Sequence, residues 1–134
     1  MTVYLVDNSV WQKAGRSPLI AARLRELSPQ QLIITCPPQI LEYCHSARTP
    51  AEHDDLRSDM EAFLEAPQHP STSLALDVQQ ALWRAGLVRA ADALDCLIAA
   101  YAIANDAVLL SSDRDFSHIA TATGGRLRQE YVAA

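Results

Sequence analysis

The chain has 134 residues, a mass of 14.7 kDa and a formal net charge of −5. This length predicts one domain, residues 1–134, large enough to bury a hydrophobic core without disulfide or zinc cross-links. A hydrophobic content of 49% and a charged content of 20% exclude a disordered chain. Taken alone, the negative charge argues against a basic nucleic-acid-binding module.

The sequence indicates a cytoplasmic protein. No apolar run approaches the ~18 to 20 residues of a membrane span, and residues 1–6 lack the features of a signal peptide. The chain has three cysteines, Cys36, Cys44 and Cys96. They form no C-x-x-C pair and predict reduced, mostly buried thiols. A zinc site from Cys44, His45 and His53 is an alternative, but its spacing matches no common ligand pattern.

The first elements alternate between strand and helix. Residues 3–6 form a short apolar run that predicts a buried strand, which ends in the turn and cap residues 7–9. A serine and a proline then open a helix over residues 17–28. Residues 32–35 predict a second short strand.

The middle of the chain is predicted to be helical. Pro37 and Pro38 open one helix, and a capping box with proline at the first helical position opens another, over residues 50–64. Residues 66–71 contain two prolines and predict a loop. Two further helices are expected, over residues 73–85 and 91–105.

The last third returns to the strand pattern. Residues 107–111 predict a third strand, residues 116–120 a short helix, and residues 126–128 a last strand. Because strands alternate with helices, the fold class is α/β, with a central, mainly parallel sheet flanked by helices.

Four acids interrupt apolar segments, where a purely structural acid is least expected. Asp7 and Asp113 each follow the carboxyl end of a predicted strand, the edge at which ligands bind in parallel sheets. Asp95 lies near the start of an apolar helix, and Glu42 lies within an apolar run after a strand. Each acid alone is also explained as a helix cap, a turn residue or a solvated side chain. Together they are expected to converge on one edge of the sheet.

Converging carboxylates repel one another unless a cation neutralises them. A ligand set made only of oxygen favours Mg²⁺ or Mn²⁺ over zinc or copper. Such a site activates a water for attack on a phosphodiester, and a second ion would stabilise the leaving oxygen. The sequence has no Walker A, G-x-G-x-x-G or G-x-S-x-G motif. It therefore favours metal-assisted hydrolysis over nucleotide-dependent or covalent chemistry.

Four segments then resemble the ordered motifs of PIN-domain proteins. Residues 5–9 read LVDNS and resemble the opening hhD-x-[S/T] signature, and residues 38–42 read PQILE and resemble the second motif with its single glutamate. Residues 95–102 read DCLIAAYA and are similar to the third motif, D-x-x-I-A-x-x-A. Residues 110–116 read LSSDRDF and match the fourth. Size and spacing most resemble the VapC-type toxins of toxin–antitoxin systems.

The resemblance implies a PIN-like three-layer fold and a Mg²⁺-dependent endoribonuclease that leaves a 5′-phosphate and a 3′-hydroxyl. It implies that the metal-binding and catalytic acids are Asp7, Glu42, Asp95 and Asp113. Asp115 matches a further acid that would bind a second ion or a metal-bound water. Ser9 matches a hydroxyl residue that supports the first acid. Asp92 competes with Asp95 for the third-motif role, and the register favours Asp95, with Asp92 as a helix cap.

The resemblance also implies partners: an antitoxin of the VapB type that covers the acidic site, an RNA substrate such as tRNA or rRNA, and a second copy in a homodimer. Arg114 would contact phosphate or pair with a neighbouring acid. Trp11 and Trp83 would stack on unpaired bases or belong to the core or an interface. Two bound divalent ions would bring the net charge from −5 to −1, which weakens the argument from charge against RNA.

Two other functions fit parts of the pattern. A catalytically inactive PIN-like binding module would share the fold, but such a protein is expected to lose some of the four acids. A phosphorylation receiver domain is also small, parallel α/β and acidic at the sheet edge. It needs a lysine near the end of a late strand, and the one lysine here is Lys13.

Overall fold

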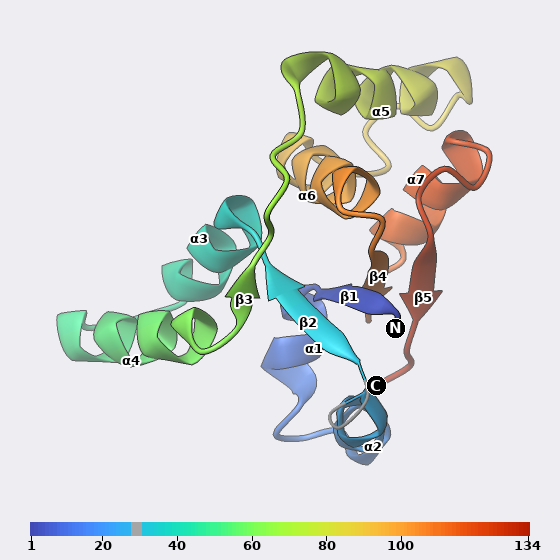
Figure 1. Ribbon diagram of the computed structural model, residues 1–134. Helices are drawn as coiled ribbons and strands as arrows, with labels where there is room; N and C mark the ends of the chain where they lie inside the picture. The colour runs from blue at the N-terminus through green and yellow to red at the C-terminus, as the bar shows by residue number, and fades with distance from the viewer. Residues whose placement is uncertain (28–30) are drawn as a thin grey trace.

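The computed structural model describes residues 1–27 and 31–134, and within them five strands form one sheet in the order β3-β2-β1-β4-β5 (Figure 1). The strands are β1 (Val3–Val6), β2 (Leu32–Thr35), β3 (Leu64–Glu65), β4 (Val108–Ser111) and β5 (Gln129–Tyr131). The helices are α1 (Asn8–Lys13), α2 (Pro18–Leu27), α3 (Pro37–His45), α4 (Pro50–Glu61), α5 (Thr72–Arg84), α6 (Ala93–Ala104) and α7 (Asp115–Ala122). Every pairing between the described strands is parallel, so the predicted α/β class is confirmed.

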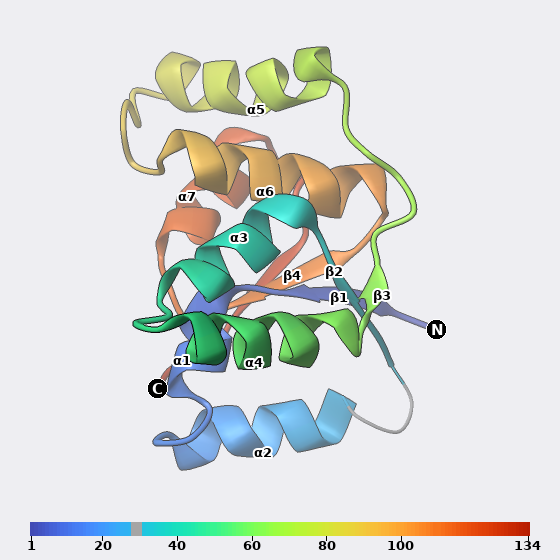
Figure 2. The same ribbon diagram turned by 90° about the vertical axis from the view of Figure 1, so that its left-hand side faces the viewer.

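The sheet is buried on both faces. Leu5 is in register with Ile34 on one side and Leu109 on the other, and all three pack in one core cluster with residues of α5, α6 and α7. Their neighbours Val6 and Leu110 point to the opposite face and pack against α1 and α2. Figure 2 shows α5 and α6 on one side of the sheet and α2 on the other, which gives three layers.

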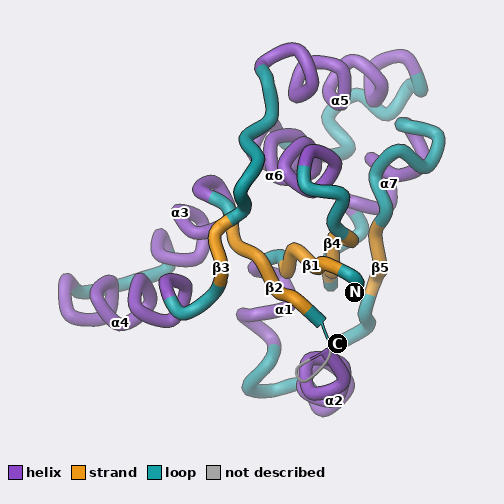
Figure 3. Tube along the Cα trace, viewed as in Figure 1, coloured by secondary structure: helices purple, strands orange, loops and turns teal. Residues whose placement is uncertain are grey.

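The strands are short compared with the helices and loops around them (Figure 3). Because helices cover both faces, the strands need apolar residues at consecutive positions, which explains the unbroken apolar runs at residues 3–6 and 108–110. The first strand lies in the middle of the sheet. The chain goes from β1 to β2 on one side and later to β4 on the other, so the strand order reverses at β1 and β4. This reversal is the usual ligand-binding place of open α/β sheets.

The chain enters a helix directly after β1, where the sequence suggested turn and cap residues. The Asp7 carboxylate accepts a hydrogen bond from the Ser9 amide at 3.0 Å and so caps α1. The helix has only six residues, too few to show a helical period in the sequence.

The predicted helix over residues 50–64 is too long. It ends at Glu61, and Leu64 and Glu65 pair with β2 as the edge strand β3. The Ala66 amide then donates to the Thr35 carbonyl at 2.7 Å. Two residues of strand carry no recognisable alternation, so the sequence pattern extends the helix across them.

The last strand lies three residues later than predicted. The Leu127 amide donates to the Thr123 hydroxyl at 3.3 Å, and the Leu127 side chain is buried in the core, so this residue completes the turn after α7. Pairing with β4 starts where the Arg128 carbonyl accepts from the Leu109 amide at 2.9 Å.

The remaining expectations about elements agree with the structure. The helix expected over residues 17–28 is present as α2, although its predicted last residue lies outside the described part of the chain. The three cysteines are buried and unpaired, as predicted. Among the helices that the structure describes, none is both long and apolar enough to cross a membrane.

Candidate functional site

Asp7 is the most buried of the predicted site acids. It follows β1, its own amide donates to the Leu110 carbonyl of β4 at 2.9 Å, and its side chain is 4% exposed. One carboxylate oxygen, Oδ2, accepts from the Ser9 amide, whereas Oδ1 is buried without a hydrogen-bond partner. Burial raises the pKa of Asp7 above its usual value, and the nearby charge of Glu42 raises it further, against the hydrogen bonds from Ser9.

Glu42 reaches the same place from α3. Two prolines start this helix directly after β2, the neighbour of β1, so its first turns lie beside the carboxyl end of β1. The Oε1 atom of Glu42 accepts a hydrogen bond from Asn8 Nδ2 at 3.0 Å. Its effect on the pKa of Asp7 shows that the two carboxylates are electrostatic neighbours.

Asp95 lies in the first turn of α6 and is buried. Burial, followed by the charges of Asp92 and Asp7, raises its pKa to about 8. Its carboxyl group interacts with that of Asp115, and this interaction also raises the pKa of Asp95. The side chain of Asp92 accepts from the Asp95 amide at 2.8 Å, which confirms the predicted helix cap.

The other two acids lie after β4. Asp113 is exposed, and its Oδ1 accepts from the Asp115 amide at 2.9 Å. Asp115 begins α7 and is half-buried. Burial and the charge of Asp113 raise the pKa of Asp115. Asp113 and Asp115 thus form a short turn, and the carboxylate of Asp115 interacts with that of Asp95.

The five carboxylates form a chain of neighbours around the ends of β1 and β4. In order, they are Glu42, Asp7, Asp95, Asp115 and Asp113. In residues 1–27 and 31–134, no three histidine, cysteine, aspartate or glutamate side chains are arranged to hold one metal ion as they stand. The same holds for Cys44, His45 and His53, which therefore do not form the alternative zinc site in the described structure. Oxygen-only donors and the unpartnered Asp7 Oδ1 nevertheless fit a hard divalent cation.

Ser9 and Lys13 hold the end of β4. The Ser9 hydroxyl accepts from the Ser112 amide at 2.9 Å, and the Lys13 ammonium donates to the Ser112 carbonyl at 3.1 Å. Ser111 Oγ in turn accepts from the Asp113 amide at 2.9 Å. Ser9 and Lys13 are four residues apart, so they lie on the same face of α1. They fix the backbone that carries Asp113.

Arg114 is expected either to contact phosphate or to pair with a neighbouring acid. Its guanidinium lies 3.7 Å from the ring centroid of Tyr131, the last residue of β5, in a cation–π contact. Within the described residues it forms no ion pair with Asp113 or Asp115. The expectation that it pairs with an adjacent acid is therefore wrong. Contact with phosphate stays a prediction.

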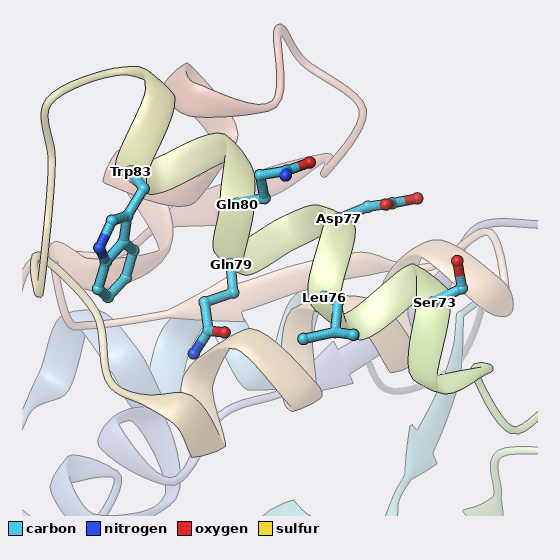
Figure 4. Close-up of a pocket in the computed structure, with 6 residues that line it drawn as sticks. All are labelled: Ser73, Leu76, Asp77, Gln79, Gln80 and Trp83. Carbon is cyan, nitrogen blue, oxygen red and sulfur yellow. The ribbon is translucent and has the colours of Figure 1, made fainter.

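The two tryptophans differ in their surroundings. Trp11 packs against the core cluster of α1 and α2, with its ring 5.3 Å from that of Phe63, so it is a packing residue. Trp83 is 46% exposed on the outer side of α5. It borders a hollow whose lining includes none of the five site acids, and Figure 4 shows the residues that line it. The residues that line this hollow are Ser73, Leu76, Asp77, Gln79, Gln80 and Trp83.

Comparison with known proteins places this geometry in a family. Residues 4–122 match the sequence model of the PIN domain. The chain belongs to the PIN-domain family. This PIN-domain protein is 33% identical to Ribonuclease VapC21 of Mycobacterium tuberculosis over 135 aligned residues, which cover 99% of this chain and 96% of the relative. The resemblance drawn from the four motifs is therefore confirmed.

Solved structures share the fold of this PIN-domain protein at lower identity. VapBC2 from Rickettsia felis, bound to a DNA fragment from its promoter, superposes with a TM-score of 0.75 at 16% identity over 98% of this chain and 99% of that one. VapBC-5 from Mycobacterium tuberculosis, a member of the VapBC family of toxin–antitoxin systems, gives 0.67 at 19% identity over the full length of both chains.

Sequence reasoning missed the side chains that support the acids of this PIN domain. Asn8 occupies the unspecified position of the hhD-x-[S/T] signature, and the sequence gives Lys13 meaning only as an argument against a receiver domain. The signal for Lys13 was its spacing of four residues from Ser9, which has meaning only once residues 8–13 are known to be helical. Tyr131 gave no signal, because its partner Arg114 lies on a different element.

The raised pKa of Asp95 predicts a pH-dependent stability of the metal-free protein. The folded state keeps a proton on Asp95 that the unfolded state releases near its ordinary pKa of 3.8. This stabilisation is complete below about pH 4 and is lost as the pH rises towards 8. Since one pKa unit corresponds to about 1.4 kcal/mol, Asp95→Asn is expected to be more stable than the wild type near pH 9, by on the order of a few kcal/mol, and nearly equal to it near pH 4.

Thermal unfolding in a chelating buffer between pH 4 and 9 measures this difference. The exposed acid Asp54 on α4 provides the control, because Asp54→Asn is expected to shift the melting temperature equally at pH 6 and pH 9. A constant difference between the wild type and Asp95→Asn over this range would contradict the assigned pKa.

Proposed function

We propose that this chain is the toxin of a toxin–antitoxin pair, a metal-dependent endoribonuclease that hydrolyses RNA phosphodiester bonds. The observation that carries the proposal is the buried Asp7 carboxylate at the end of the central strand β1, whose Oδ1 has no partner and whose pKa is raised by burial and by the charge of Glu42. The 33% identity to Ribonuclease VapC21 along almost the whole chain supports the choice of RNA as substrate. By the family resemblance, the RNA is a tRNA or an rRNA.

Asp7, Glu42, Asp95, Asp113 and Asp115 are the residues that would hold Mg²⁺, with Mn²⁺ as a substitute. Their donors are carboxylate oxygens, which Mg²⁺ prefers. Bound there, the ion would lower the pKa of a water and neutralise charge at the scissile phosphate. The pKa of Asp95 is raised in the metal-free protein, so we expect metal binding to favour its ionised form and to release protons near neutral pH.

Several other side chains serve the site without touching the metal. Ser9 and Lys13 hold the backbone before Asp113 through Ser112, so this exposed acid starts from a fixed position. Arg114 is held over the Tyr131 ring, which leaves the edge of its guanidinium for a phosphate of the RNA. An anionic substrate would thus have an arginine and a bound metal ion to hold it, despite the net charge of −5.

The purified chain is expected to cut RNA with Mg²⁺ or Mn²⁺, leaving a 5′-phosphate and a 3′-hydroxyl, and to lose activity with a chelator. Asp7→Asn, Asp95→Asn and Asp113→Asn are each expected to lower the cleavage rate by about 100-fold or more, because changes next to metal ligands already cost 10- to 100-fold. Gel analysis of a labelled RNA measures the rate, and mass spectrometry identifies the ends.

Asp54→Asn removes an exposed acid from α4 and is expected to cleave like the wild type. If the three site variants kept wild-type activity in a nuclease-free preparation, the assignment would be wrong. If the wild type bound no Mn²⁺ at millimolar concentration, the inactive PIN-like binding module would be the better description.

We propose further that an antitoxin of the VapB type covers the acidic edge. The support is the similarity of the fold to VapBC complexes from several bacteria. Expression of the chain alone is expected to arrest growth, and co-expression with a cognate antitoxin is expected to relieve the arrest. Asp7→Asn should not arrest growth. Arrest by Asp7→Asn as strong as by the wild type would contradict a toxicity that depends on this site.

We propose that the free chain is a homodimer and that the outer face of α5 is its contact. Leu76 and Trp83 are each about half exposed on this helix (Figure 4), and Val88, in the segment that follows it, is also about half exposed. Asp77 and Arg84 on this helix provide opposite charges for a two-fold pairing. Light scattering is expected to give twice the 14.7 kDa of one chain, and Trp83→Glu is expected to give one chain. A monomeric wild type would refute the dimer.

A further inference from the structure

A buried pair of amide side chains lies beside the acids at the start of α1. Asn8 is 2% exposed and Gln39, on α3, is fully buried. The Asn8 amide nitrogen donates to the Gln39 main-chain carbonyl at 2.9 Å and to Glu42 Oε1 at 3.0 Å. The Gln39 amide nitrogen donates back to Asn8 Oδ1 at 3.1 Å. The two side chains thus join α1 to α3 at the position of Glu42.

The surroundings of Asn8 require an amide at this position. Its nitrogen faces two acceptors, a carbonyl and a carboxylate, and its oxygen faces a donor. An aspartate would place oxygen against oxygen, and an alanine or a serine is too short to reach Glu42 in the same way. All three hydrogen-bonding positions used by Asn8 are therefore matched, in a place where an unmatched polar group is costly.

Glu42 depends on this contact for its orientation. A glutamate that is only half-buried has several rotamers, and fixing it costs up to about 1.5–2 kcal/mol of side-chain entropy. Within the described residues, the Glu42 carboxylate accepts a single hydrogen bond, from Asn8 to Oε1, and Oε2 accepts none. Asn8 follows Asp7 directly, so one short segment carries an acid of the site and the group that orients a second acid.

We propose that Asn8 is a positioning residue, which holds Glu42 Oε1 and thereby sets the Glu42 carboxylate toward Asp7 before metal binds. The proposal rests on the proposed function, because it takes Glu42 as a metal ligand. Groups that orient the first ligands of a metal typically account for 10- to 100-fold in affinity. Asn8 acts only through Glu42, so its contribution should disappear when Glu42 no longer binds the metal.

Calorimetric titration of the full chain with Mn²⁺ tests this dependence. Asn8→Ala is expected to weaken Mn²⁺ binding by about 10-fold or more. Glu42→Gln is expected to weaken it as well, and the double variant should bind no more weakly than Glu42→Gln alone. Additive losses in the double variant would overturn the proposal, since they would show that Asn8 acts independently of Glu42.

A matched control separates orientation from general stability. Cys44→Ala removes a buried side chain from the same helix without touching the Asn8–Glu42 bond, and it is expected to lower the melting temperature with Mn²⁺ affinity within about 2-fold of wild type. If Asn8→Ala does not fold, Asn8→Ser replaces it, because its hydroxyl keeps a polar group at the start of α1. An Asn8 variant that is folded and binds Mn²⁺ as tightly as the wild type overturns the positioning role.

The same titration tests the metal site and the role of Asn8 separately. A wild type that binds no Mn²⁺ refutes the metal site of the proposed function, and the role of Asn8 with it. A wild type that binds Mn²⁺ and is weakened by Glu42→Gln, but not by Asn8→Ala, refutes the role of Asn8 alone.

Discussion

The burial of Asp7 at the end of the central strand is the constraint on which the rest of the site depends. A carboxylate that is 4% exposed, with one oxygen unpartnered, is unfavourable in an apolar interior. Every neighbour that adds negative charge increases this cost, and the charges of Glu42 and Asp95 lie within its electrostatic reach. The hydrogen bond from the Ser9 amide at the start of α1 offsets part of the cost, and the pKa of Asp95 is raised, which lowers the negative charge near Asp7. A divalent cation would serve the same purpose.

The helix α1 is small, but it connects most of the elements that carry the acids. Asp7 caps it, Asn8 binds the glutamate of α3, and Ser9 and Lys13 bind the turn after β4. Six residues thus fix the relative positions of two strand ends and one helix. The site acids accept few hydrogen bonds from side chains, so the contacts made by α1 largely determine where these acids lie.

The order of strands and helices could be predicted from the sequence because the sheet is covered on both faces. Residues 3–6 and 107–110 are unbroken apolar runs, and the first acids after them, Asp7 and Asp113, mark the ligand-binding edge. The family resemblance added Glu42 and Asp95. The roles of these acids stay predictions; the structure adds that, besides burial, the charge of Glu42 raises the pKa of Asp7 and the charge of Asp7 raises the pKa of Asp95.

The features that escaped prediction depend on contacts between distant parts of the chain. Leu64 and Glu65 form a strand because β2 offers an edge, and Leu127 leaves the strand pattern because Thr123 binds its amide. The same holds for Asn8, whose amide is explained by Gln39 and Glu42, and for Arg114, whose partner Tyr131 lies at the end of β5. Local propensity carries no information about such partners.

The central position of the first strand also affects when the acidic edge can exist during synthesis. β1 leaves the ribosome well before its neighbour β4, which is made at residues 108–111, and the carboxylates of Asp7 and Asp113 are more than 100 residues apart. Contacts of such long sequence separation form late in folding. A nascent or truncated chain that ends before β4 therefore lacks the complete acid cluster. The group of charges is complete only after residue 115 has been translated.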